Sequence, residues 1–544
     1  MSAAPCGPGP GEADRQSSMG AAGGEGGAPT AHDRWALAAV CAVLFLTFLD
    51  TTIVSVALSD VQSRLHAGVT QLQWVVNGYA LTFASLMMIA GSLSDRFGRK
   101  RVMLIGLSIF AAGSLLGALA PNPSVLIAAR VVMGVGAAAS EPGTLSVIRH
   151  LYPDTGDRAR ALGAWAAVSG LALALGPVIG GALVGLGTWR AVFWFNVVAV
   201  VAVVAAAAVS VPESSDPQSA RLDYAGFVVA AVGLGALTFA VILGETEGYR
   251  SSVVIVLFAV GVVGLVSFIR VERASKAPIL DLSYFREASF SGSLAVVFVL
   301  FFAIFSIFFF TALYLSAVVG YSAYRVALEF GPMTVAMITA AGLAGRRVAL
   351  AGPRLPMAEG CVLAAAGILL SEVLITASRP SLWLLATLAL AGYGFGTSVV
   401  PVTSASLAAV PPERSGMAAS ATNTSRELGA VFGVAVLGAL VNSHLTTDLT
   451  HRLRALKIPA NFISIVITGV EKGEAPSGVT GGGSIYDKVI GAAYGAFRSG
   501  LEVALVTSGV ALLVVAIVAS VTLRGQGPAG IARAPAAPDP EVGL

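Results

Sequence analysis

The chain has 544 residues, of which 56% are hydrophobic and 12% are charged, and its mean hydropathy is +0.83. A soluble domain carries about twice that share of charged residues, so the composition indicates a polytopic membrane protein. The net charge of +3 comes from cations distributed over the chain, without the dense basic patch that a nucleic-acid partner requires.

The sequence contains no pattern for a metal or another cofactor. Cys6, Cys41 and Cys361 have neither the spacing of metal ligands nor that of a disulfide framework. A Gly-rich phosphate-binding loop ending in Lys-Ser or Lys-Thr is absent, which argues against a pump driven by ATP. We therefore expect no cofactor and no enzymatic activity.

The first segment, residues 1–34, is rich in Gly, Ala and Pro. It has no apolar core flanked by basic residues, so we predict a disordered tail and not a signal peptide. The first membrane span then serves as its own insertion signal. We predict a second disordered tail over residues 524–544.

Between the tails, apolar segments of about 18 to 25 residues recur, each long enough to cross a bilayer as a helix. They predict an all-α membrane protein with fourteen spans. We place the spans at 35–58, 72–93, 102–120, 124–148, 161–185, 190–211, 223–243, 251–270, 289–318, 324–345, 357–377, 382–409, 416–441 and 499–523.

The loop 91–101, with the sequence GSLSDRFGRKR, sets the orientation of these spans. It carries Arg96, Arg99, Lys100 and Arg101, and short basic loops stay on the cytoplasmic side of a membrane. The other even-numbered connections hold most of the remaining loop arginines, which agrees with this orientation. Both termini are then cytoplasmic. An alternative is that these cations serve orientation only.

One connection, 442–500, is far longer than the others and is predicted to be extracellular. Its stretch 486–497, YDKVIGAAYGAF, is modestly amphipathic. It either lies on the outer membrane surface or forms part of a plain extracellular loop.

Three ionisable residues in early spans are candidates for proton coupling. Asp50 lies past the middle of the first span, where a carboxylate is costly and usually functional. Counting depth at 1.5 Å per residue places Arg130 of the fourth span at a similar level, so the two could pair. Glu141 shares a face of the fourth span with Arg130, about 16 Å nearer the cytoplasm. The alternatives are a static buried pair, a structural tether for Arg130 and an inert Glu141.

Later spans contain candidates for substrate binding. Glu329, near Pro332, is expected at the outer mouth of a cavity, where it could select cations or simply be solvated. Asn423 and Arg426 lie in the thirteenth span, in ATNTSRELGAVFG, next to the acidic Glu427.

Several of these motifs resemble the major facilitator superfamily, and specifically its fourteen-helix drug:proton antiporter family. The resemblance runs over about 35–523. The loop 91–101 resembles the signature loop after the second helix; the matching residues are Gly91, Asp95, Arg96, Gly98 and Arg99. In the superfamily's arrangement Asp95 should face the start of the thirteenth helix, near Gly416, where a carboxylate is favourable. We therefore expect this loop to act as a conformational latch that joins the two halves only when the cytoplasmic side is closed. The stretch 129–138, ARVVMGVGAA, resembles the proton-antiporter motif, and 49–58 and 423–429 resemble the family's first-helix and thirteenth-helix patterns. The fifth span resembles the motif that separates exporters from importers, through Gly170, Gly176, Pro177, Gly180 and Gly181.

The two halves of the chain also resemble each other, because 341–350 reads as a shortened copy of 90–104. Secondary transporters are often built from such repeats. We therefore expect six-helix bundles over 35–211 and 289–523, the second carrying the long loop, with two linking transmembrane helices in 212–288.

The resemblance implies a proton-coupled exporter of amphipathic drugs or antibiotics that works by alternating access. Its partners would be protons, the lipid bilayer and a neutral or cationic small molecule, and it would act as a monomer in a bacterial cytoplasmic membrane. Two alternatives remain at this point. One is a proton symporter that imports a small solute, and the other is a membrane sensor of the same fold without transport.

Overall fold

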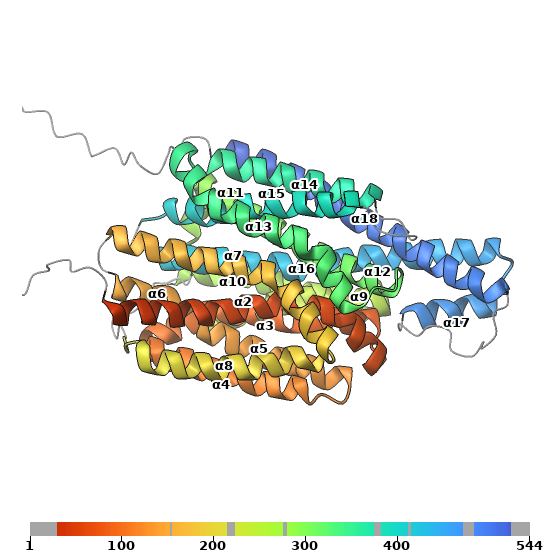
Figure 1. The fold of residues 1–544 in the computed structure, drawn as a ribbon, viewed down its shortest axis with the longest axis horizontal. Coiled ribbons are helices and arrows are strands. Elements are labelled where there is room, and N and C mark those ends of the chain that lie inside the picture. The colour runs from red at the N-terminus through yellow and green to blue at the C-terminus, as the bar shows by residue number, and fades with distance from the viewer. Residues whose placement is uncertain are drawn as a thin grey trace, which may run out of the picture.

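The computed structural model describes residues 30–152, 155–214, 224–275, 280–374, 382–411, 415–471 and 484–523. All regular structure in these ranges is helical. The helices run side by side along one long axis, and the two ends of the described chain lie at the same end of the bundle (Figure 1). The predicted tails 1–29 and 524–544 lie outside the described residues.

The helices form two groups, as the predicted halves require. The first group occupies the lower part of Figure 1 and contains α2 (Ala31–Leu65), α3 (Val69–Phe97), α4 (Arg99–Ala118), α5 (Pro123–Ser140), α6 (Pro142–Leu151), α7 (Thr155–Leu186) and α8 (Arg190–Ser210). The second group contains α11 (Ala288–Ser306), the π-helical turn η2 (Ile307–Thr311), α12 (Ala312–Ala317), α13 (Ala323–Ala351), α14 (Arg354–Leu374), α15 (Leu382–Ala408), α16 (Ser415–Ala455), α17 (Ala460–Glu471) and α18 (Ser484–Thr522).

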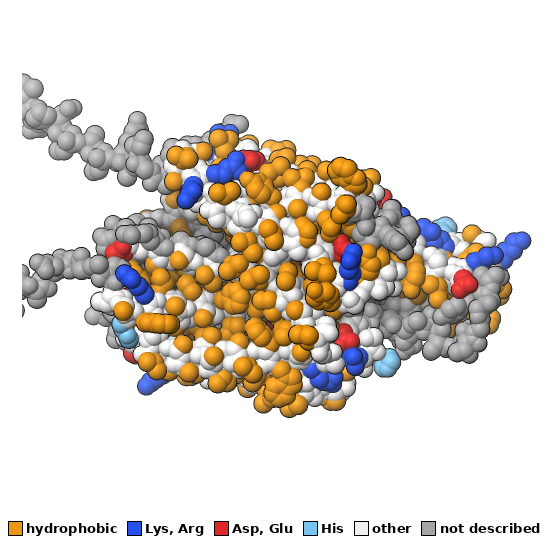
Figure 2. Space-filling model, viewed as in Figure 1, with side chains coloured by type: hydrophobic (Ala, Val, Ile, Leu, Met, Phe, Trp, Pro, Cys, Tyr) orange, Lys and Arg blue, Asp and Glu red, His pale blue; other side chains and the backbone are white. Residues whose placement is uncertain are grey.

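Thirteen helical segments of the described chain are long and apolar enough to cross a membrane. The remaining predicted span, 72–93, lies in α3, which has 29 residues and is therefore about 44 Å long. Hydrophobic side chains cover the middle of the molecule in Figure 2, and most charged side chains lie toward its two ends. This distribution is what a bundle that crosses a bilayer requires.

The two groups meet mainly along two pairs of helices. α7 packs against α13, and α3 packs against α16. A continuous core of buried apolar side chains runs through both groups. Relative motion of the groups therefore has to slide or open these two contacts.

Two further helices, α9 (Tyr224–Glu247) and α10 (Ser252–Ala274), separate the groups in sequence, followed by the short 3-10 turn η1 (Leu282–Arg286). α9 lies against both α3 and α16, at the seam between the groups, and α10 packs on α9. Only 17% of the apolar segment of α10 is buried. The pair is peripheral, in agreement with its lack of polar motifs inside the bilayer.

Two of the predicted spans are interrupted. The span 124–148 breaks at Glu141, between α5 and α6, because Pro142 has no N–H to continue the helical hydrogen bonds. The span 289–318 contains the π-helical turn η2 between α11 and α12. Turns of this kind are frequent at functional sites.

The connection predicted as a long loop over 442–500 is instead largely helical. α16 continues to Ala455, α17 follows, and the stretch 486–497 belongs to α18 and not to a separate surface helix. Leu445, Leu449 and Leu453 recur every four residues and form a small core with Ile463 and Ala496. This packing lets the helices continue beyond the membrane region as the projection at the right of Figure 1. Residues 472–483 lie outside the described ranges.

Candidate functional site

The first buried polar cluster joins three helices of the first group. The Asp50 carboxylate on α2 forms an ion pair with the Arg130 guanidinium on α5, as the depth count predicted. The Asn196 side-chain amide on α8 donates to the other Asp50 oxygen at 2.6 Å. All three side chains are at most 1% exposed. The carboxylate is therefore held on both oxygens, away from solvent.

Arg130 has further contacts that fix its position. Its Nε donates to the Val75 carbonyl at 2.9 Å, and its guanidinium lies 4.4 Å from the centre of the Tyr79 ring. The Tyr79 hydroxyl in turn donates to the Thr47 carbonyl on α2 at 2.9 Å. Arg130 thus connects α2, α3 and α5, and any loss of its bond to Asp50 changes how these helices are held together.

Asn196 was not among the residues predicted from sequence. It is an amide side chain inside α8, whose other central residues are apolar. A polar residue in such a span has to find a partner, because an unsatisfied amide in the membrane is costly. A single amide residue within an otherwise apolar span is a sequence signal that could have identified Asn196 as a site residue.

The second buried cluster connects the two groups. Asn423 on α16 donates to Glu141 Oε1 at 3.0 Å, and Arg426 Nη2 lies 3.7 Å from the same oxygen. Arg426 Nε also donates to Glu427 Oε1 at 3.3 Å. The Arg426 guanidinium stacks on Phe48 of α2, 3.8 Å from the ring centre. Phe48 is two residues from Asp50, so the two clusters are neighbours through α2.

The second cluster holds two carboxylates and one guanidinium. Glu141, Arg426 and Glu427 are between 1% and 7% exposed. Within the described part of the chain, Glu141 Oε2 and Glu427 Oε2 have no hydrogen-bond partner. Glu141 is the residue at the break between α5 and α6. The structure therefore brings the predicted proton-coupling residue Glu141 together with the predicted substrate-binding residues Asn423 and Arg426.

Glu329 is not part of either cluster. It lies on α13, is 4% exposed, and accepts a hydrogen bond from Arg325 Nε one helical turn earlier, at 3.1 Å. Arg325 is largely exposed. The carboxylate is thus compensated by its own helix.

The glycines of α7 allow two close helix contacts. A side chain at Gly176 would overlap Thr52 on α2, and one at Gly180 would overlap the Ile53 carbonyl. A side chain at Gly181 would overlap Ala327 on α13, in the other group. Pro177 lies between these glycines, inside the helix. Gly170 differs, because no atom lies within 4 Å of the position that its Cβ would take.

This difference provides a matched pair of substitutions. Gly181→Ala should push α7 and α13 apart, because the new methyl group would also lie 2.8 Å from the Ala323 carbonyl oxygen. We expect a loss of stability of about 1–3 kcal/mol, typical of overpacking, and slower transport. Gly170→Ala should be neutral or slightly stabilising, because glycine inside a helix costs roughly 0.5–1 kcal/mol relative to alanine. Unfolding temperature in detergent and dye efflux from cells measure both effects, and equal behaviour of the two variants would contradict the assigned contact.

The 91–101 loop makes a contact within the first group. Gly98 has φ of +105°, a conformation that suits glycine, and lies between α3 and α4. The Glu213 carboxylate, after α8, accepts hydrogen bonds from the backbone N–H groups of Lys100 and Arg101 at 3.1 and 3.2 Å. A carboxylate at the first turn of α4 is favourable because these N–H groups have no helical partner.

The other residues of the predicted latch lie around this contact. Arg96 is exposed, with its guanidinium 5.6 Å from the centre of the neighbouring Phe97 ring. The Arg99 backbone N–H donates to the Ser214 carbonyl at 2.9 Å. Gly91 faces Pro142 of α6. The side chain of Asp95 lies outside what the structure describes, so the predicted contact of Asp95 with the start of α16 stays a prediction.

Residues 40–434 match the Major Facilitator Superfamily. The chain is 35% identical over 417 residues to the multidrug resistance protein Stp of Mycobacterium tuberculosis, covering 76% of this chain and 77% of Stp. It is 35% identical over 415 residues to the methylenomycin A resistance protein of Bacillus subtilis, covering 75% of this chain and 88% of that protein.

The fold is also similar to those of solved membrane transporters. A bacterial homologue of the human lysosomal transporter Spinster, in an inward-facing and unoccupied conformation, superimposes with a TM-score of 0.56. The identity is 18%, and the match covers 91% of this chain and 98% of that one. The family match and the shared fold agree with the resemblance of the 91–101 loop to the signature loop of this superfamily. The chain belongs to the Major Facilitator Superfamily.

Proposed function

We propose that this chain exports amphipathic drugs or antibiotics in exchange for protons. It would act as a monomer in a bacterial cytoplasmic membrane, with both termini on the cytoplasmic side. The names of its relatives support export, because Stp is a multidrug resistance protein and the Bacillus protein confers resistance to an antibiotic by name. The observation that carries proton coupling is the buried pair of Asp50 and Arg130.

The proton step would take place at the Asp50 carboxylate. A proton on Asp50 cancels its charge and removes the ion pair, while Arg130 keeps the Val75 carbonyl and the Tyr79 ring. A buried cation without its counter-ion is unfavourable. Protonation therefore favours any rearrangement of α2 against α5 that gives Arg130 a new partner. Deprotonation restores the arrangement described above.

Alternating access would use the contacts between the two groups. On one side, the Thr334 hydroxyl of α13 donates to the Ala174 carbonyl of α7 at 2.7 Å, and a side chain at Gly185 would lie 3.2 Å from Tyr324. The contact at Gly185 lies toward the ends of α7 and α13 that we predict to be extracellular, whereas Thr334 and Ala174 lie near the middle of these helices. In the alternate state they would open, and the latch residues of the 91–101 loop would help to close the cytoplasmic side.

The second cluster would be where substrate and proton compete. Asn423 and Arg426 would contact the substrate, and Glu141 would accept a proton or a cationic group when the two groups separate. Glu329 would act at the outer mouth, with its charge tempered by Arg325. The membrane potential supplies enough energy for drug export, because each elementary charge moved across the membrane is worth about 2.3 kcal/mol per 100 mV.

Purified full-length protein in liposomes tests the proposal. The liposomes contain a pH-sensitive dye and start without a pH gradient. An imposed concentration gradient of a transported drug or antibiotic should then drive protons in the opposite direction. A proton flux in the same direction as the drug would indicate a symporter. If no compound of an amphipathic panel changes the pH trace relative to that of protein-free liposomes, the proposed transport is wrong.

A further inference from the structure

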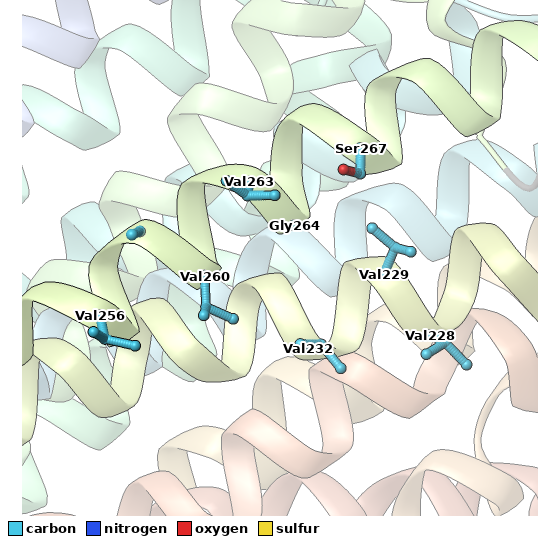
Figure 3. A pocket seen from close by; sticks show the side chains of 9 residues that line it. Val228, Val229, Val232, Val256, Val260, Val263, Gly264 and Ser267 are labelled. Carbon is cyan, nitrogen blue, oxygen red and sulfur yellow. The ribbon is translucent and has the colours of Figure 1, made fainter. Parts of the chain in front are cut away.

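A long groove lies between the two peripheral helices α9 and α10. Its volume is about 500 Å³, and Figure 3 shows the side chains that line it. Except for Ser267, all its lining residues are apolar or glycine. Among them, Val232, Val256 and Val263 are each more than half exposed on the outer surface of the molecule. The groove is separate from both buried clusters.

The groove has a polar end and an apolar end. Ser267 lies at the same end as Val228 and Val229, whereas Val256 lies at the other end (Figure 3). Ser267 and Val256 are eleven positions apart on α10, which corresponds to about 16 Å. An apolar channel of this length, open to the bilayer, suits one extended fatty-acyl chain far better than a compact polar ligand.

A cation stands just beyond the polar end. Val256, Val260, Val263, Ser267 and Arg270 recur at intervals of four, three, four and three residues, so they share one face of α10. Arg270 is exposed. In the predicted orientation it lies at the cytoplasmic boundary of the membrane, the depth at which phospholipid phosphates are found. Arg273 is also exposed but is turned by roughly 140° from Val260 and 120° from Ser267, whereas Arg270 is turned from them by about 80° and 60°.

From this arrangement we propose that the α9–α10 groove binds an anionic phospholipid of the cytoplasmic leaflet. One acyl chain lies along the valines between the two helices, and the headgroup phosphate pairs with Arg270. The complementarity of apolar groove and adjoining cation selects a lipid over a neutral hydrophobic compound. Because α9 also contacts α3 and α16, the bound lipid lies beside the seam between the two moving groups.

Lipid binding to the intact protein tests this directly. Detergent-purified full-length protein is titrated with phosphatidylglycerol or phosphatidylcholine of identical acyl chains and analysed by native mass spectrometry. We expect tighter retention of phosphatidylglycerol. Arg270→Gln should weaken its binding about fivefold, the effect of removing one arginine near a lipid headgroup. Arg273→Gln makes the same change of charge away from the groove and should leave the affinity unchanged.

A second substitution tests the acyl-chain part of the site. Ala259 lines the groove and is exposed, so Ala259→Phe should fill the groove and lower retention of both lipids. Size-exclusion profiles and unfolding temperatures show whether each variant is folded. If Ala259→Phe does not fold, Val260→Phe fills the same groove in its place. Equal effects of Arg270→Gln and Arg273→Gln would overturn the headgroup assignment. If the Phe variants retain both lipids as well as the wild type does, the groove is not a lipid site. The same conclusion follows if the wild type forms a dimer that the Phe variants do not form, because the groove would then be an interface between two copies of the chain.

Discussion

Asp50→Asn will abolish drug-driven proton movement in liposomes, because the substituted side chain cannot exchange a proton. Removing a side chain that transfers protons typically costs at least about 100-fold in rate, and we expect a loss of at least that size here. The variant should lose some stability, because Arg130 is left buried without its counter-ion. The helix bundle should nevertheless persist, since Asn fits the same space and Arg130 retains the Val75 carbonyl and the Tyr79 ring. Proton release measured with a pH-sensitive dye gives the rate.

The control for this variant is Asp448→Asn. Asp448 makes a comparable ion pair with Arg452, but it lies in the projection beyond the membrane region and is partly exposed. It should transport at the wild-type rate. Asp50→Glu keeps a titratable group and should retain part of the coupling. Undiminished pH-driven export by Asp50→Asn would show that the proton is carried elsewhere.

Arg426→Met will destabilise the protein by about 3–5 kcal/mol, the usual cost of removing one partner of a buried ion pair. The substitution leaves Glu141 and Glu427 facing each other without the guanidinium that lies near both. It also removes the contact with Phe48 on α2. The measurement is the unfolding free energy or, where unfolding is irreversible, the temperature of half-inactivation in detergent.

Two further variants separate this electrostatic cause from simple loss of packing. Adding Glu427→Gln to Arg426→Met removes one of the two carboxylates and should restore a large part of the stability. Arg347→Met breaks a pair with Glu359 in which both side chains are about 40% exposed, so it should cost less than about 1 kcal/mol. If the double variant is no more stable than Arg426→Met alone, the two carboxylates do not share Arg426.

The sequence by itself was sufficient to predict thirteen of the membrane spans, the position of most helix ends and the family. Hydropathy and charge act locally, because each span has to satisfy the bilayer on its own. The 91–101 loop and the glycines around Pro177 are also contiguous in sequence. Asp50 and Arg130 could be matched because depth in a membrane is a single coordinate that can be counted from the helix ends.

The partners of these residues were decided by the tertiary structure. Asn196 reaches Asp50 across 146 positions, and Asn423 reaches Glu141 across 282. Depth alone does not say which helix faces which, since that depends on packing around the bundle axis. The same reason explains the helical projection over 442–500. Its apolar residues are too few to mark a membrane span, and they became a core only when α16, α17 and α18 were brought together.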